Sequence, residues 1–455
     1  MVFKSINPAT GKQFVTYKVM PQKHIDGIIN NLHRSYLSWS QTDFEYRRKI
    51  LKKAGEILIK RKNVYAKLMT DEMGKPIVQA VSEIEKCAYI CQYFAQQAEE
   101  FLAPQIIKTD ARKSYITFEP LGVIFAIMPW NFPFWQVFRF LAPMIMSGNV
   151  GILKHSPNVT GCALVIEDII RDTGVKKEIF RTIIADNDAA SFVIQHPHIK
   201  AVTLTGSTRA GRSVASQAGA VLKKAVLELG GSDPYIILKD ADLDKAVTTC
   251  VTSRMINSGQ SCIAAKRFIV VKSLQKKFEK MFVAQMKAKK MGDPLLDNTD
   301  IGPMARFDLR DELHAQVQKS IRQGAKLLCG GYIPLGDGAF YPATVLSDVK
   351  KNMLAYSEEL FGPVASIIPV RNEKEAIAVA NDNQYGLGAA VFSQNYRKAE
   401  MIAKKKIEAG SCFVNAFVRS DPRLPFGGIK GSGYGREMSY FGIYEFVNIK
   451  TVYVA

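Results

Sequence analysis

Apolar residues recur every three to four positions through the first hundred residues of the chain. This 3.6-residue period places them on one face of a helix, so residues 22–101 are expected to be helical, with Pro104 ending the region. The residues that set the period are Ile25, Ile28, Ile29 and Leu32, followed by Ile50, Leu51, Ala54, Ile57 and Leu58.

A different pattern begins at Gly122, where short apolar runs alternate with helical stretches. Strands that are unbroken apolar runs and that alternate with helices indicate a parallel sheet covered on both faces. The expected strands are 122–128, 150–154, 182–185, 201–205 and 224–228, with helices at 135–146 and 161–171. A doubly wound, Rossmann-like α/β domain follows from this order.

A second series of the same kind starts at Pro234, after a hinge at Gly230 and Gly231. Its expected strands are 234–238, 267–271, 325–331 and 364–370, with helices at 242–257 and 274–290. Two further stretches stand outside both series. Residues 113–120 alternate like a strand, and the extended stretch 444–454 is a candidate partner for it or for another subunit.

Length and composition fit two domains. A chain of 455 residues exceeds the size at which one core stops growing. With 47% apolar and 23% charged residues it is typical of globular proteins. No apolar run reaches the roughly 18 residues of a membrane helix, and the N-terminus MVFKSINPATGK has no signal-peptide core. We therefore expect a cytoplasmic protein without a membrane partner.

Charge and cysteine content narrow the function classes. The net charge of +19 is compatible with nucleic acid, a membrane face or anionic ligands. The lysines are spread along the chain without interleaved aromatic residues, which favours a solvated basic surface over nucleic-acid binding. The seven cysteines lack the paired spacings of a zinc site or a disulfide framework. Free thiols and no metal site are expected.

Candidate chemistry follows the carboxyl ends of the strands, where open α/β sheets bind ligands. Gly206 and Ser207 follow strand 201–205 and open a helix. They suit either an anion site or an ordinary helix N-cap. Lys154 ends strand 150–154, where it could meet a ribose or phosphate, or extend its charge to solvent along apolar surface.

Three other residues each have a catalytic and a structural interpretation. Asn131, held between two prolines, is a candidate oxyanion donor or a helix cap. Glu228 ends an apolar strand, as a general base or as half of a buried ion pair. Cys262 follows a Gly-Gln turn, as a nucleophile or as a small core residue. The Gly-rich stretch 425–437 is no P-loop, and its glycines suit close backbone contact between domains or subunits.

Six motifs in order resemble the NAD(P)-dependent aldehyde dehydrogenase family over essentially the whole chain. They are PWNFP at 129–133, TGS at 205–207, LELGG at 227–231, GQSC at 259–262, EELFGPV at 358–364 and PFGGIKGSGYGRE at 425–437. Each is modest evidence alone, whereas six in the order of the family are strong.

The resemblance implies a role for each candidate. Cys262 matches the nucleophile, Glu228 the general base and Asn131 the oxyanion donor, acting with the backbone N–H of Cys262. A thiolate would add to an aldehyde, hydride would leave to the nicotinamide, and the thioester would be hydrolysed by water that Glu228 activates. The implied cofactor-binding residues are Trp130, Lys154, Pro157, Gly206, Ser207, Leu229, Glu359 and Phe361.

Cofactor choice is expected to depend on Pro157. Family members that prefer NAD often carry a Glu at this position, three residues after the ribose-binding lysine, here Lys154. Without that carboxylate nothing repels a 2′-phosphate, which Lys154 could pair. NADP or NAD is therefore the expected cofactor, with NADP accepted.

Within the family, GQSCIAAKRF and SDPRLPFGGIKGSGYGRE are most similar to bacterial succinate-semialdehyde dehydrogenases. Arg139 matches an arginine that those enzymes use for the substrate carboxylate, and Arg419 and Ser420 are further substrate candidates. A second substrate arginine of some relatives is Ile256 here. The alternatives are a broader aldehyde dehydrogenase, acting on glutarate semialdehyde or medium-chain aldehydes, and a catalytically silent structural or nucleic-acid-binding relative.

The family resemblance also implies the division of the chain. Residues 1–103 and 122–229 would form the NAD(P)-binding domain and 230–431 the catalytic domain. Residues 104–121 and 432–455 would form a small β arm that joins subunits into a homodimer or homotetramer.

Overall fold

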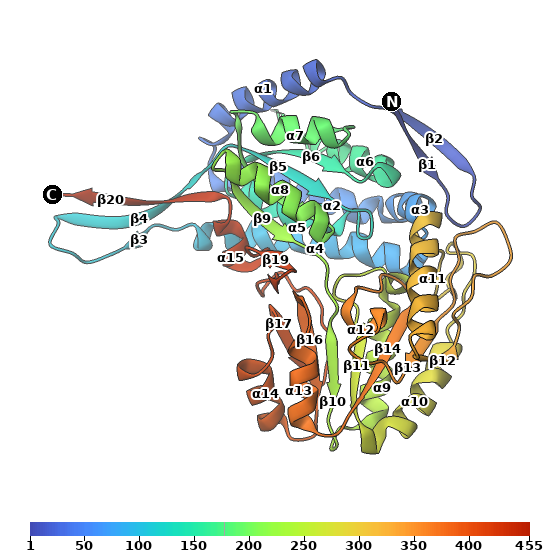
Figure 1. Ribbon diagram of the computed structural model, residues 1–455. Helices are drawn as coiled ribbons and strands as arrows, with labels where there is room; N and C mark the ends of the chain where they lie inside the picture. The colour runs from blue at the N-terminus through green and yellow to red at the C-terminus, as the bar shows by residue number, and fades with distance from the viewer. Residues whose placement is uncertain (177) are drawn as a thin grey trace.

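Two α/β units and a projecting β arm make up the computed structural model, which describes residues 1–176 and 178–455 (Figure 1). One unit contains a six-stranded sheet and the N-terminal helices, and the other contains a seven-stranded sheet. The predicted α/β fold class, with two units and a small β arm, is confirmed.

The N-terminal region is helical, as the 3.6-residue period predicts. A β-hairpin precedes these helices. The sequence pattern did not reveal it, because most residues of its two strands are exposed or half-buried and give no apolar run. Helix α4 packs closely on α2 and α5. The elements are β1 (Val2–Ile6), β2 (Gln13–Lys18), α1 (Gln22–Trp39), α2 (Phe44–Lys60), α3 (Lys62–Met73) and α4 (Ile77–Phe101).

The first sheet has the strand order β19-β9-β8-β5-β6-β7. All its pairs are parallel except β19 with β9. Every residue of β6 is buried, as expected for a strand covered on both faces. The elements are β5 (Val123–Met128), α5 (Trp135–Met146), β6 (Val150–His155), η1 (Pro157–Val159), α6 (Thr160–Arg171), β7 (Phe180–Ile183), α7 (Asn187–Gln195), β8 (Ile199–Thr205), α8 (Thr208–Ala220), β9 (Lys224–Glu228) and β19 (Gly433–Tyr434).

The second sheet has the order β12-β13-β14-β11-β10-β16-β17 and is parallel except for β12. Successive residues of β10 face two different cores, Tyr235 one and Ile236 the other. Its elements are β10 (Pro234–Ile237), α9 (Leu243–Met255), η2 (Ile256–Gly259), β11 (Arg267–Val271), α10 (Lys272–Lys287), α11 (Phe307–Arg322), β12 (Lys326–Cys329), β13 (Thr344–Ser347), α12 (Leu354–Ser357), β14 (Val364–Val370), α13 (Glu373–Asn381), β16 (Gly388–Phe392), α14 (Tyr396–Lys405) and β17 (Ser411–Val414).

The β arm pairs β20 with β4 along the whole length of both strands (Figure 1). The expected extended stretch 444–454 begins later than predicted, because Ser439–Tyr444 forms helix α15. Tyr453 and Ile449 of the arm are exposed. The arm consists of β3 (Gln105–Ile106), β4 (Lys113–Pro120) and β20 (Val447–Val454).

The chain returns from the second unit to the first through the Gly-rich stretch 425–437. A side chain at Gly433 would place its Cβ 1.9 Å from the carbonyl oxygen of Leu227, where β19 pairs with β9. Within the same stretch, β18 (Ile429–Lys430) pairs with β15 (Tyr385–Gly386). The interpretation of these glycines as residues that permit close backbone contact is confirmed.

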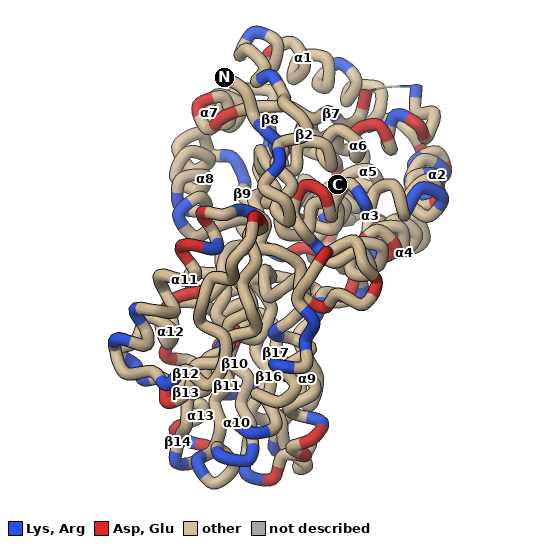
Figure 2. The backbone as a smooth tube through the Cα atoms, turned by 90° about the vertical axis from the view of Figure 1, so that its right-hand side faces the viewer, with Lys and Arg blue, Asp and Glu red and all other residues tan. Residues whose placement is uncertain are grey.

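Charged residues of both signs are distributed over both units (Figure 2). All seven cysteines are free. Within residues 1–176 and 178–455, no helix is long and apolar enough to cross a bilayer.

Candidate active site

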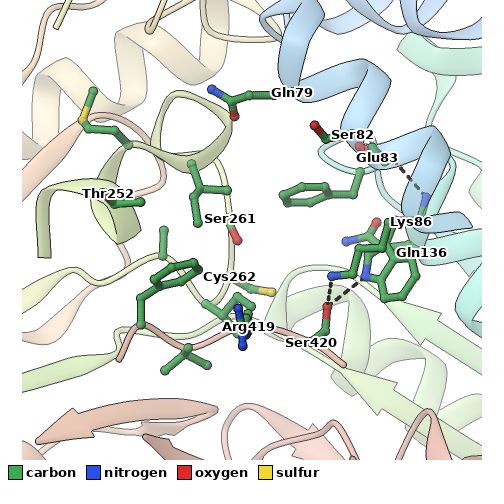
Figure 3. Close-up of a pocket in the computed structure, with 18 of the residues that line it drawn as sticks. Gln79, Ser82, Glu83, Lys86, Gln136, Thr252, Ser261, Cys262, Arg419 and Ser420 are labelled. Atoms are coloured by element: carbon green, nitrogen blue, oxygen red, sulfur yellow. Dashed lines mark hydrogen bonds between the residues drawn. The ribbon is translucent and has the colours of Figure 1, made fainter. Parts of the chain in front are cut away.

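Two cavities meet at Cys262. One, of about 430 Å³, lies between α4, α5 and the loop that follows β17 (Figure 3). The other, of about 520 Å³, lies at the carboxyl ends of β5, β8 and β9. Cys262 and Gln136 line both. We refer to these as the α4 cavity and the sheet-edge cavity.

A strained backbone segment leads into Cys262. Asn257, Ser258 and Gly259 have φ values of 53°, 53° and 78°, which only glycine adopts freely. A Cβ at Gly259 would lie 2.2 Å from the carbonyl oxygen of Gly362. Such strain persists only where surrounding contacts enforce it, and it is concentrated at functional sites.

Hydrogen bonds to distant segments hold this strained run in place. The backbone N–H of Asn257 donates to Oε1 of Gln79 at 2.7 Å, and that of Gly302 donates to Oγ of Ser258 at 3.0 Å. The loop conformation is therefore fixed by tertiary contacts rather than by local preference.

The Cys262 side chain is half-buried and lies between the two cavities. Burial raises its pKa to about 12, opposed by the positive charges of Lys266 and Arg139. Nζ of Lys266 donates to the carbonyl oxygens of Ser261, Cys262 and Ala264 at 3.0, 2.8 and 3.2 Å. The sequence analysis missed Lys266, which supplies both a support for the loop and a buried cation beside the thiol.

Asn131 lies beside this loop, with its amide oriented by two contacts. Oδ1 accepts a hydrogen bond from Nε2 of Gln136 at 3.0 Å, and Nδ2 donates to the carbonyl oxygen of Gln260 at 3.1 Å. Nδ2 of Asn257 donates to the carbonyl oxygen of Asn131 at 2.7 Å. The turn that carries the proposed oxyanion donor is thereby tied to the cysteine loop. Gln136 is a second residue that sequence reasoning missed.

The alternative interpretation of Asn131 as a helix cap is wrong. The first N–H groups of α5, those of Phe134 and Trp135, donate to Oε1 of Glu83 at 3.0 and 2.9 Å. Glu83 also forms a buried ion pair with Lys75. A carboxylate at a helix N-terminus is favourable to the helix dipole, so Glu83 positions α5 and leaves the Asn131 amide free of capping.

Glu228 is buried at the end of β9 but lines neither cavity. Its carboxylate faces Gly427, whose Cβ would lie 2.8 Å from Oε1. Burial, and then the nearby carboxyl of Glu437, raises its pKa well above the ordinary value. No ion pair to Glu228 exists among the described residues, so the structural ion-pair interpretation fails. The structure does not bring this carboxylate next to Cys262.

Arg139 lines the α4 cavity, as the substrate prediction requires. One of its nitrogens, however, forms a buried ion pair with Glu437 at 2.7 Å, and its guanidinium lies over the ring of Phe426. Its charge is therefore already compensated in part. Arg419, Ser420 and Ile256 line the same cavity, with Arg419 exposed at its edge.

The sheet-edge cavity collects most of the predicted cofactor residues. Trp130 and Phe361 pack edge to face, 5.6 Å between ring centroids. Ser207 caps α8, accepting from the N–H of Ala210 at 3.3 Å, so the N-cap interpretation is correct for this hydroxyl. Trp130, Gly206, Ser207, Leu229, Glu359 and Phe361 all line the cavity.

Lys154 and Pro157, the other two predicted cofactor residues, lie outside that cavity lining. Lys154 lies in β6, the neighbour of β5 in the same sheet, and Pro157 follows that strand. Lys154 is buried, and burial lowers its pKa. The solvent-directed alternative for this lysine is therefore wrong.

The carboxylate of Glu359 contacts two other groups of this chain. Its Oε1 accepts from the N–H of Gly231 at 3.0 Å and lies 3.3 Å from Nζ of Lys266. This links the sheet-edge cavity to the cation beneath the cysteine loop.

The site combines a doubly wound sheet, a helix N-terminus at the carboxyl edge of that sheet, and a cysteine between two cavities. This combination defines the class of protein. The chain belongs to the aldehyde dehydrogenase family, whose model matches residues 1–452.

Individual relatives narrow the comparison. The chain is 48% identical to a probable NADP⁺ succinate-semialdehyde dehydrogenase of Synechocystis sp., over the full length of both. It is 46% identical to an NAD(P)⁺ succinate semialdehyde dehydrogenase of Escherichia coli, covering 99% of this chain and 97% of the relative. A solved succinic semialdehyde dehydrogenase from Streptococcus pyogenes in complex with NADP⁺ has a TM-score of 0.97 at 37% identity, covering 99% of each chain.

Proposed function

We propose that this protein oxidises succinate semialdehyde to succinate, with NADP⁺ or NAD⁺ as hydride acceptor. The observation that carries the proposal is the α4 cavity, where the Cys262 thiol shares one space with the cations of Arg139 and Arg419. The relatives named for this activity cover the whole chain. An anionic aldehyde suits such a cavity better than a neutral one.

The sheet-edge cavity fits a dinucleotide. The hydroxyl of Thr205 is buried and lacks a hydrogen-bond partner among the described residues. It ends β8, shortly before the N-terminus of α8, where N–H groups favour an anion such as a pyrophosphate. Trp130 and Phe361 offer aromatic surface and Glu359 a carboxylate for a ribose. The cofactors named for the relatives agree with the expectation that NADP is accepted.

The Cys262 thiol must first lose its proton, because burial raises its pKa to about 12. The thiolate then adds to the aldehyde carbon and forms a tetrahedral thiohemiacetal. Nδ2 of Asn131 and the N–H of Cys262 would donate to the new oxyanion, with the amide preset by Gln136. The bound dinucleotide supplies the acceptor for the hydride. A thioester then joins Cys262 to the acyl group.

Glu228 would act in the hydrolysis of this thioester. In its observed position, burial and then the nearby carboxyl of Glu437 raise its pKa well above the ordinary value, which favours the protonated form. A rotation away from Glu437 toward the cavity would reduce both effects and produce a base. It could then take a proton from water as the hydroxide attacks the thioester.

An aldehyde panel assayed with NAD⁺ and NADP⁺ in parallel tests the proposal. Succinate semialdehyde should give the highest kcat/KM among succinate semialdehyde, glutarate semialdehyde, butanal and hexanal. Cys262→Ala should abolish turnover with all four while the protein stays folded by circular dichroism. A neutral aldehyde as the best substrate would replace the proposal with a broader aldehyde dehydrogenase.

We also propose the domain division given by the family resemblance, a cytoplasmic location and a homo-oligomer. Support for assembly comes from the β arm, which projects from the first unit (Figure 1). The side chains of Ile106, Ile449 and Tyr453 on this arm are exposed. Light scattering of the purified protein, compared with a variant truncated before Val447, tests this assembly.

A further inference from the structure

We propose that Lys86 binds the substrate carboxylate, together with the hydroxyl of Ser420, at the end of the α4 cavity. This inference rests on the proposed function and deepens it, because it names the group that selects an anionic aldehyde. Lys86 has no counterpart among the residues that the sequence analysis considered.

Helix α4 presents one face to the cavity. Gln79, Ser82, Glu83 and Lys86 are spaced three, four and seven residues from the first, and all four line the cavity. That spacing places them on one side of a helix. Figure 3 shows Lys86 and Ser420 around the same space as Cys262.

The hydrogen bonds of Ser420 leave its proton free. Its Oγ accepts from Nζ of Lys86 at 2.7 Å and from Nε1 of Trp135 at 3.1 Å. A hydroxyl oxygen has two acceptor lone pairs and one donor proton. Both lone pairs are therefore used, and the proton has no acceptor among the described residues. Nζ of Lys86 retains two further protons.

Lys86 carries a charge that the protein does not neutralise. Within the described residues, no carboxylate lies within ion-pair distance of its Nζ. Nζ instead lies 4.1 Å from the centroid of the Trp135 ring, which attracts a cation weakly. A partly buried cation without an anion is unfavourable, so a carboxylate ligand would complete the site.

The charged groups around Lys86 have other partners. Glu83 on α4 pairs with Lys75, and Asp421 on the neighbouring loop pairs with Arg423 at 2.7 Å. Arg139 on α5 pairs with Glu437. Burial, then the charge of Arg139, lowers the pKa of Lys86 to about 8. The ammonium is therefore present at neutral pH and is lost above about pH 8.

This arrangement also accounts for Ile256. Where some relatives carry an arginine, this chain has an apolar side chain on the same cavity. A cation from α4 would serve the same carboxylate from another wall.

Steady-state kinetics on the full-length protein test the inference, with succinate semialdehyde and butanal as charged and neutral four-carbon substrates. Lys86→Met should raise KM for succinate semialdehyde on the order of tenfold to a hundredfold, as for a lost hydrogen bond to a charged group. The change with butanal should be several-fold smaller. Lys86→Arg should recover most of the loss.

Lys62→Met is the control, because Lys62 pairs with Glu85 of α4 at 2.5 Å but does not line the cavity. It should alter KM for succinate semialdehyde less than threefold. Because a variant could fail to fold, a second measurement uses only the unmodified protein. In the unmodified protein, the ratio of KM for succinate semialdehyde to KM for butanal should rise above about pH 8.

Equal effects of Lys86→Met on both substrates, a comparable loss in Lys62→Met, or a pH-independent KM ratio would each overturn the role of Lys86. Failure of the proposed function is seen separately, in the unmodified protein, as a kcat/KM for butanal above that for succinate semialdehyde.

Discussion

Replacing Gln136 with Met should slow turnover without weakening substrate binding. Both Gln136 and Asn131 are almost fully buried, and the bond from Nε2 of Gln136 is the contact that Oδ1 of Asn131 receives. Met keeps the approximate length of the side chain but cannot donate. The Asn131 amide would still be oriented by the carbonyl of Gln260, 3.1 Å from Nδ2.

The magnitude follows from what is lost. A net hydrogen bond contributes about 1 kcal/mol, and each 1.4 kcal/mol changes a rate roughly tenfold. Gln136→Met should therefore lower kcat about fivefold to tenfold. Asn131→Ala removes the donor itself and should cost roughly a hundredfold or more.

The assay is initial-rate production of reduced cofactor with succinate semialdehyde at saturating NADP⁺. KM for both substrates should stay within about twofold in Gln136→Met. Ser82→Ala is the control, since Ser82 lines the same cavity and donates to the carbonyl of Val78 rather than to Asn131. An unchanged kcat, or a raised KM with normal kcat, would refute the positioning role of Gln136.

Three further predictions concern stability, pH and cofactor choice. Glu83→Gln should lower the free energy of unfolding by about 3–5 kcal/mol in urea titration by leaving Lys75 buried and unpaired; adding Lys75→Met should recover part of it. Burial, and then the stacked ring of His198, lowers the pKa of His33 below its ordinary value of 6.5. The unfolded state therefore binds more protons than the folded state below pH 6.5, so Tm should fall as the pH drops below that value. The variant His33→Gln should show a smaller fall in Tm. Pro157→Glu should reduce kcat/KM for NADP⁺ roughly tenfold or more, by repulsion of the 2′-phosphate, with a smaller effect for NAD⁺; equal losses would contradict this reasoning.

The strands most accurately predicted from sequence are continuous apolar runs. Residues 224–228, 267–271 and 364–370 have the observed bounds of β9, β11 and β14. Strands β16 and β17 escaped prediction because their residues, GAAVF and SCFV, are small or few. They are strands because pairing with β10 and with each other extends an existing sheet.

Motif residues could be identified from sequence, but not their partners. The ion pair of Arg139 joins residues 298 positions apart, and the bond from Lys86 to Ser420 spans 334. No local pattern encodes such contacts. The direction of the Glu228 carboxylate, which faces Gly427 rather than a cavity, could not be predicted either. The direction of a side chain at a strand end depends on the space that neighbouring segments leave around it.

The position of Cys262 between two cavities has a consequence for the order of events in turnover. In the proposed function, aldehyde and dinucleotide would reach the sulfur from different sides, so neither would need to pass through the space that the other occupies. The acid product can leave while the reduced dinucleotide is still bound, or after it has gone. An alkylating reagent likewise has two approaches to the thiol, and a bound dinucleotide leaves the approach through the α4 cavity open.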